Sequence, residues 1–287
     1  MNTHDMYRAV LRDKMAVVGL IIVAVFIFAA IFGGLLAPYD PQEMTRDPST
    51  GSVNALEPPS VAHPFGTTNL GRDVFSQVLL GARTALTIGA IAAVVGISIA
   101  TVLGLLAGYF GGWADSLITR AVEFSYTIPA EPLAVIILAV LGPSFTTVIL
   151  AISVLAWRQP TRVVRNQVLT LRNRQFLKAS RVSGASHTRI LFQHIAPLTL
   201  PVALVYFPVE FGSAIIAESV ISFLGFGDPA SASWGVILRR SFNEGALQTA
   251  WWWTFSAGAA ITLATAALYF SVRPLEEVVN PRLRARR

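Results

Sequence analysis

Three long stretches without a charged residue constrain this chain more than any other feature. They run from Met15 to Tyr39, from Thr84 to Ala114 and from Gly245 to Val272, and they contain 25, 31 and 28 residues. A helix needs about 20 mostly apolar residues to cross the hydrocarbon core of a bilayer. Each stretch is therefore long enough for a transmembrane helix, and a lipid bilayer is the expected solvent.

The composition agrees with a membrane protein. Only 13% of the 287 residues are charged and 54% are hydrophobic, whereas about 25% of residues are charged in a soluble domain. The formal net charge of +6 is interpreted as the basic bias of cytoplasmic loops, so no nucleic-acid partner is expected. Because the chain has no cysteine, disulfides, thiolate metal sites and cysteine nucleophiles are excluded.

Three further apolar stretches are shorter or are interrupted by a carboxylate. Glu131 interrupts the stretch from Phe124 to Leu141, and the short stretch from Ser144 to Trp157 is expected to continue as a helix past Arg158. The third stretch, from Ile195 to Gly227, is interrupted by Glu210 and Glu218. The chain is therefore predicted to be an all-α membrane protein in contact with the lipid bilayer. Its six transmembrane helices are expected at residues 15–38, 83–109, 115–141, 145–164, 195–219 and 249–273.

The Lys and Arg residues are distributed unevenly over the segments between these helices. With the N-terminus in the cytoplasm, 17 of them fall on the cytoplasmic side and 5 on the outer side. Cytoplasmic loops carry such an excess, so both termini are predicted to be cytoplasmic. The expected segments are a cytoplasmic N-terminal segment 1–14, a first transmembrane helix 15–38, an extracytoplasmic loop 39–82, a core domain 83–273 that includes a cytoplasmic loop 158–194, and a basic cytoplasmic tail 274–287.

The cytoplasmic loop 158–194 contains eight Lys or Arg residues and no Asp or Glu. Gly184 suits the left-handed end of a first short helix, and Ser186 suits the N-cap of a second, so the loop is predicted to form a helix–turn–helix. Its small residues would let another protein approach closely, whereas its charge would also suit a basic loop resting on anionic lipid. Both interpretations stay open on the residues alone. The small residues are Ala179, Ser180, Ser183 and Ala185.

This loop resembles the EAA loop of bacterial ABC-importer permeases, because Ala179, Gly184 and Pro197 have its spacing. The chain is most similar to the C-type subunit of dipeptide and oligopeptide permeases. Lys178 stands where the general pattern has Glu, and Ser180 where it has a second Ala, so the salt link made by that Glu is not expected. Segments that carry the resemblance elsewhere are 63–76, 104–113, 217–219, 222–225, 233–235 and 280–284.

The resemblance implies a type I ABC-importer permease fold in the cytoplasmic (inner) membrane of a bacterium. It implies three kinds of partner: a second homologous permease subunit, two ATP-binding subunits or domains that would hold ATP and Mg, and an extracytoplasmic peptide-binding protein. It also implies that the loop couples ATP hydrolysis to transport. The residues assigned to this coupling are Lys178, Ala179, Ser180, Arg181, Gly184, Ala185, Ser186 and Pro197.

Catalytic motifs are absent from the sequence. There is no G-x-x-x-x-G-K-[S/T] loop to hold a nucleotide and no G-x-S-x-G turn. The four histidines are scattered without metal-ligand spacing. No catalysis, cofactor or metal is therefore expected in this chain, and ATP hydrolysis is assigned to the partner subunits.

Glu131, Glu210 and Glu218 lie within or near predicted helices. A charge at the bilayer centre costs about 2.5–3.5 kcal/mol, so each must face a cavity or a partner. Glu131, which lies between Pro129 and Pro132 where a helix is expected to break, and Glu210 are assigned to a translocation path. Glu218 has small neighbours and is assigned to helix packing, as are the glycines of the G-x-x-x-G pattern at residues 104–112.

Two alternatives to a peptide importer remain at this stage. The same family could import nickel or another small solute. A different class of protein, a proton-coupled secondary transporter, could use the intramembrane carboxylates, but the long basic loop and the lack of visible inverted halves argue against it. A membrane scaffold without transport is disfavoured by the same carboxylates.

Overall fold

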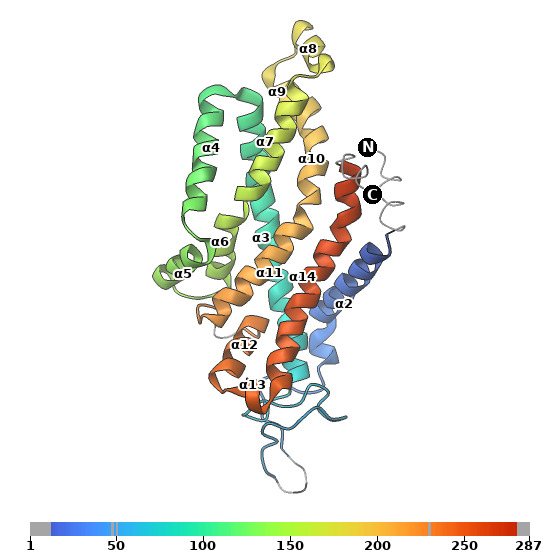
Figure 1. Ribbon diagram of the computed structural model, residues 1–287, viewed down its shortest axis with the longest axis vertical. Coiled ribbons are helices and arrows are strands. Elements are labelled where there is room, and N and C mark those ends of the chain that lie inside the picture. The colour runs from blue at the N-terminus through green and yellow to red at the C-terminus, as the bar shows by residue number, and fades with distance from the viewer. Residues whose placement is uncertain (1–12, 47–48, 50, 229–230, 280–287) are drawn as a thin grey trace.

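The computed structural model describes residues 13–279 except 47–48, 50 and 229–230 (Figure 1). Most of the predicted cytoplasmic N-terminal segment, the end of the predicted tail and the matching segment 280–284 therefore lie outside the described residues. The helices, in chain order, are α2 Lys14–Leu36, α3 Val74–Phe110, α4 Gly112–Thr127, α5 Ala130–Leu141, α6 Phe145–Ala156, α7 Arg158–Arg172, α8 Gln175–Val182, α9 His187–Arg189, η1 Ile190–Ile195, α10 Ala196–Val205, α11 Phe207–Phe223, α12 Trp234–Asn243, α13 Ala246–Thr249 and α14 Trp251–Val279.

The long helices run along the length of the molecule and alternate in direction (Figure 1). α2 descends, α3 ascends, α4 descends, α6 and α7 ascend together, α10 and α11 descend together, and α14 ascends. α8 and α9 lie at the upper end, toward which α2 begins and α14 ends, while the loop before α3, α12 and α13 lie at the lower end. Each of the six predicted spans overlaps one of these passes, although α5, the second half of the predicted span 115–141, turns away from the direction of α4.

Within the described ranges, four helices are long and apolar enough to cross a membrane: α2, α3, the continuous helix His187–Val205 and α14. A fifth candidate is the pair α4 and α5, which is bent by 85°. The break between α4 and α5 was expected near Pro129. The segments predicted at 145–164 and 195–219 are also broken, at Trp157 and at Tyr206, and the sequence analysis predicted neither break.

Other boundaries differ from the prediction as well. α3 begins at Val74, nine residues before the expected start at 83, because Asp73 caps the helix and the exposed Arg83 interrupts the apolar run without ending the helix. The short helices α12 and α13 were not predicted. Ser233 caps α12 by accepting a hydrogen bond from the Val236 N–H at 3.2 Å.

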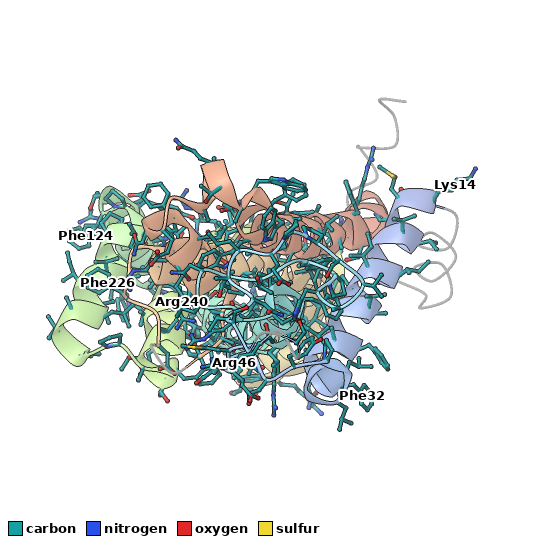
Figure 2. The ribbon with its side chains drawn as sticks, turned by 90° about the horizontal axis from the view of Figure 1, so that it is seen from below. Lys14, Phe32, Arg46, Phe124, Phe226 and Arg240 are labelled. Carbon is teal, nitrogen blue, oxygen red and sulfur yellow. The ribbon has the colours of Figure 1, made fainter. Side chains whose placement is uncertain are left out.

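α3 is the central element of the bundle. Its buried residues contribute to three apolar clusters, one with α11, α12 and α14, one with α7, α8 and η1, and one with α5, α6 and α11. By contrast, α2 lies along one edge of the bundle (Figure 2) and leaves large apolar side chains such as Leu35 and Ile31 exposed. That surface suits contact with lipid.

Two of the three glycines of the G-x-x-x-G pattern, Gly104 and Gly108, let α3 and α7 cross closely as predicted, whereas Gly112 begins α4 and a Cβ there would meet nothing within 4 Å. A Cβ atom at Gly104 would lie 2.6 Å from Val164 Cγ1, and one at Gly108 would lie 2.6 Å from Val168 Cβ. Real Cβ atoms do not approach other carbons that closely, so any side chain here would push the two helices apart.

We therefore expect Gly108→Ala to destabilise the protein by about 1–3 kcal/mol, the usual cost of overpacking. The measurement is the melting temperature of the purified protein in detergent. Gly258→Ala is the matched control, because a Cβ at this α14 position meets nothing within 4 Å and alanine favours a helix. A melting temperature unchanged in Gly108→Ala would contradict the close crossing.

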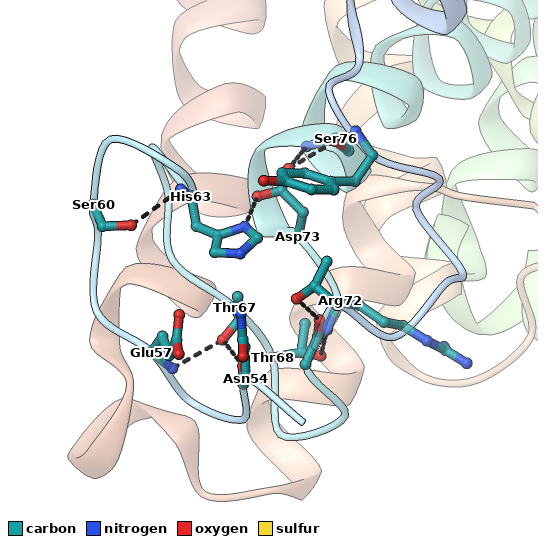
Figure 3. Close-up of polar contacts among 12 residues, drawn as sticks. Asn54, Glu57, Ser60, His63, Thr67, Thr68, Arg72, Asp73 and Ser76 are labelled. Atoms are coloured by element: carbon teal, nitrogen blue, oxygen red, sulfur yellow. Dashed lines mark hydrogen bonds and ion pairs between the residues drawn. The ribbon is translucent and has the colours of Figure 1, made fainter. Parts of the chain in front are cut away.

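The loop before α3 is folded by polar side chains of segment 63–76 (Figure 3). His63 Nδ1 lies 2.9 Å from Asp73 Oδ1, and both residues are buried. The other carboxylate oxygen of Asp73 accepts hydrogen bonds from the N–H and the hydroxyl of Ser76, both at 2.7 Å, so Asp73 caps α3. Trp252 of α14 donates to the Thr67 carbonyl at 3.3 Å. This segment therefore joins the lower end of α3 to α14.

Candidate functional site

Three helix breaks share one cause in the sequence. Pro129 keeps the preceding Ile128 out of the helical region, and Ile128 has φ −103° and ψ 125°. Pro160 and Pro208 lack the N–H that would continue the helix across Trp157 and Tyr206. These breaks end α4, α6 and α10 and start α5, α7 and α11.

One cavity of about 190 Å³ lies where the new helices begin. Its walls come from α5, α6, α11 and the first residue of α7. Glu131 is the second residue of α5, Arg158 the first of α7 and Glu210 the fourth of α11, and all three line the cavity. The helix that begins after each break thus places one charged side chain in the wall of the cavity. Discontinuous helices of this kind form the substrate sites of many transporters.

The three charged residues differ in how they are held. Glu210 is only 8% exposed and no hydrogen bond holds its carboxylate within the described structure, while Glu131 is exposed. Arg158 is fixed by hydrogen bonds from Nε to the Leu155 carbonyl at 3.0 Å and from Nη1 to the Ser125 carbonyl at 2.9 Å. The two carboxylates are therefore available to a cation that enters the cavity.

Glu218 lies apart from this cavity although it is on the same helix as Glu210. It is 1% exposed, and its Oε1 accepts a hydrogen bond from the Ser222 hydroxyl at 2.7 Å. Beside it, Gly235 of α12 packs closely against the Ser219 carbonyl oxygen. Glu218 is thus enclosed between α11 and α12, and its Oε2 has no hydrogen-bond partner in the described structure.

The predicted helix–turn–helix of the loop is present, with a specific turn. Gly184 has φ +82°, its N–H donates to the Arg181 carbonyl and the Ala185 N–H donates to the Ser180 carbonyl, both at 3.0 Å. These are the two bonds of a Schellman C-cap. Ser186 caps α9 by accepting from the Arg189 N–H at 3.3 Å.

The second helix of the loop does not stop as expected. It continues from α9 through the π-helix η1 into α10, so the loop between α7 and α9 is shorter than 158–194. Pro197 is the second residue of α10 and removes an N–H from the helix interior. A wide π turn directly before it relieves that defect. Movement of the loop would therefore reach α10 directly.

The loop is anchored on one side and open on the other. Leu177 is buried against the α3–α7 end, and the Tyr109 hydroxyl of α3 lies 2.8 Å from His187 Nδ1. On the free side, Val182 is 91% exposed. Exposed apolar side chains beside positive charge are typical of a protein-binding surface. The other exposed residues of this surface are Phe176, Lys178, Ala179, Arg181 and Ser186.

The sequence analysis missed Arg158 as a site residue, because it counted Arg158 with the basic loop. The signal was its position at the end of an apolar run and two residues before Pro160. It assigned Glu131 and Glu210 to a translocation path but did not place them in one cavity, since no sequence pattern relates the starts of two helices at Ala130 and Phe207.

Residues 100–285 match the family described as the inner membrane component of binding-protein-dependent transport systems. Residues 2–59 match the N-terminal transmembrane domain of oligopeptide transport permease C. The first match alone covers more than half of the chain. The chain therefore belongs to the family of inner membrane components of binding-protein-dependent transport systems.

Three relatives illustrate the similarity. The dipeptide transport system permease protein of Alkalihalophilus pseudofirmus is 34% identical over 282 residues, which are 98% of this chain and 90% of the relative. The oligopeptide transport system permease protein of Bacillus subtilis is 37% identical over 226 residues, 78% of this chain and 72% of the relative. The glutathione transport system permease protein of Pectobacterium atrosepticum is 34% identical over 241 residues, 84% of this chain and 78% of the relative.

These matches confirm the resemblance and the fold class given by the sequence. The protein is a multi-pass, all-α permease of the inner membrane and a component of an ABC transporter. It is not an enzyme, because separate subunits hydrolyse ATP in this family, and the family implies no cofactor in this chain. Membership also favours an importer over a secondary transporter or a scaffold.

Proposed function

We propose that this chain is one permease half of an ATP-driven importer that moves di- and oligopeptides into the cytoplasm. Relatives named for dipeptides, oligopeptides and glutathione support a peptide cargo over nickel or another small solute. The observation in the molecule that carries the proposal is the cavity shared by Glu131, Glu210 and Arg158. Its two carboxylates suit the ammonium end of a peptide, and its guanidinium suits the carboxylate end.

The assembly we propose contains a second homologous permease subunit, two ATP-binding subunits that hold ATP and Mg, and an extracytoplasmic peptide-binding protein. The exposed side of Glu131 supports a cavity that a second permease half completes. Exposed apolar side chains of α4 and α5, such as Phe124 and Val140, support contact with that half or with lipid.

In the proposed mechanism the loop around Gly184 docks on an ATP-binding subunit. ATP closes the two ATP-binding subunits and moves the docked loop. The continuous helix from α9 through α10 carries this movement toward α11, where Glu210 lines the cavity. The two permease halves then rock as rigid bodies between outward and inward openings.

The test is uptake by proteoliposomes that contain the complete complex with ATP inside. We expect alanylalanine to enter when the binding protein is supplied outside, and we expect uptake to stop without ATP. Uptake driven by a proton gradient in the absence of ATP would instead establish a secondary transporter. Uptake of nickel with no uptake of alanylalanine would keep the protein in the importer class but show that its cargo is not a peptide.

The proposed orientation places both termini, the loop 158–194 and the tail 274–287 in the cytoplasm, and residues 39–82 outside. We expect Val61→Cys to react in whole cells with a thiol reagent that cannot cross the membrane, and Lys14→Cys to react only after permeabilisation. Val61 is fully exposed and Lys14 is exposed at the start of α2, away from the loop around Gly184, and the chain has no cysteine of its own. Reaction of Lys14→Cys in intact cells would reverse the orientation.

A further inference from the structure

A second polar cavity lies at the lower end of the molecule, opposite the end that carries α8 (Figure 1). It has a volume of about 260 Å³ and lies between the loop before α3, α12 and the start of α14. Arg72 and Arg240 line it, together with Gln77, Glu244 and Trp253. Figure 3 shows Arg72 on the loop, and Figure 2 shows Arg240 on the lower face.

The positive charge at this cavity is balanced only in part by the described residues of its lining, because Glu244 is the one carboxylate among them. Neither Arg72 nor Arg240 forms a salt bridge with a described residue, and neither does the adjacent Arg239. The guanidinium of Arg239 lies over the backbone at Gly225. Partial burial and the nearby charges of Arg72 and Arg239 lower the pKa of Arg240. Three guanidinium groups therefore repel one another beside a cavity that could hold an anion.

Two residues that line the same cavity, Arg72 and Trp253, carry hydrogen-bond donors without an acceptor. Trp253 is 2% exposed, and its indole N–H has no acceptor in the described structure. The Nε–H of Arg72 is also buried without an acceptor. A buried donor without a partner is energetically unfavourable, so two such donors in the wall of one cavity point to an acceptor bound there. One acceptor, Oε1 of Gln77, is unpaired as well, so the unpaired donors of the lining outnumber its unpaired acceptors.

We infer that this outer cavity binds a carboxylate group. Two arginines and Glu244 give the lining a net charge of +1, which suits a single negative charge. Arginine donors match the two oxygens of a carboxylate. The carboxylate can come from the C-terminus of a peptide or from an acidic side chain of the extracytoplasmic binding protein. These two sources rest on the proposed function, whereas the site itself does not.

The experiment uses the complete complex in phosphatidylcholine nanodiscs and compares Arg240→Gln and Arg72→Gln with the wild type. Calorimetry measures the binding of alanylalanine and of its C-terminal amide in one arm, and the binding of the peptide-binding protein in the other. Arg83→Gln is the matched control, because Arg83 is an exposed arginine of α3 that does not line the cavity. Arg240→Lys keeps the positive charge, so binding retained in this variant would show that the effect of Arg240→Gln comes from lost charge and not from misfolding.

If the carboxylate belongs to the cargo, Arg240→Gln weakens alanylalanine binding at least tenfold, and the amide binds the wild type correspondingly weakly. If it belongs to the binding protein, Arg240→Gln weakens that complex at least tenfold and leaves alanylalanine unaffected. Arg72→Gln should act in the same arm, and Arg83→Gln in neither. Unchanged binding in both arms for Arg240→Gln and Arg72→Gln overturns the inference, whatever the outcome of the uptake assay.

Discussion

Replacing Gly184 by valine should reduce ATP-driven peptide uptake at least tenfold while the chain still inserts into the membrane. Gly184 has φ +82°, a conformation that costs a residue with a side chain about 1–2 kcal/mol. A β-branched residue is the least tolerant of it. A shift of 1.4 kcal/mol changes an equilibrium tenfold, so the C-capped turn that sets α8 against α9 would cease to be the main conformation. The measurement is peptide-stimulated ATP hydrolysis and uptake by the reconstituted complex.

Gly142 provides a matched control for backbone strain. It has φ +81° and, like Gly184, no atom within 4 Å of a built Cβ, but it lies in the turn between α5 and α6. Because its ψ of 141° is even less accessible to a side chain, Gly142→Val should lower stability at least as much without uncoupling hydrolysis from uptake. Full coupling in Gly184→Val, or equal loss of coupling in both variants, would remove the assignment of this loop to the ATP-binding subunits.

The second large effect is expected at the carboxylates of the α5–α7–α11 cavity. Glu210→Gln and Glu131→Gln should each lower peptide uptake tenfold or more with a normal yield of the assembled complex. The reason is that an interaction between a carboxylate and an ammonium group contributes about 1.5–3 kcal/mol, and glutamine keeps the size of the side chain while removing its charge. We also expect the charge preference among peptides to shift away from cationic ones.

Glu218→Gln is the comparison that separates the two roles on one helix. Glu218 is buried away from the cavity and bonded to Ser222, so its replacement should lower the yield of intact complex and leave the uptake per assembled complex unchanged. Yield is measured by size-exclusion chromatography and uptake in proteoliposomes. The reverse pattern, with assembly lost in Glu210→Gln and transport lost in Glu218→Gln, would exchange the two assignments.

The long apolar helices α2, α3 and α14 could be predicted because apolar length is a local property of the sequence. The turn at Gly184 and the cap at Ser186 could be predicted for the same reason, since the capping bonds join residues close in sequence. The close approach at Gly104 and Gly108 was also predictable, although the partner helix α7 was not.

The breaks at Trp157 and Tyr206 were missed because an apolar count ignores what a proline does to a helix. Pro160 and Pro208 were visible in the sequence, but a proline in a transmembrane helix can be tolerated. That Glu131, Arg158 and Glu210 meet in one cavity depends on how α5, α7 and α11 pack together. The contact between His63 and Asp73, which helps to fold the loop before α3, is likewise one that a sequence motif does not reveal.

The most direct test of the account asks where the peptide passes. A dipeptide that carries a photoreactive diazirine side chain is supplied with the binding protein and ATP to the reconstituted complex, illuminated during turnover, and its attachment sites are mapped by mass spectrometry. The account predicts labels on the cavity walls of α5 and α11, near Glu131 and Glu210, that depend on ATP and are lost with excess alanylalanine. Competed labels confined to other helices, with none on α5 or α11, would contradict it.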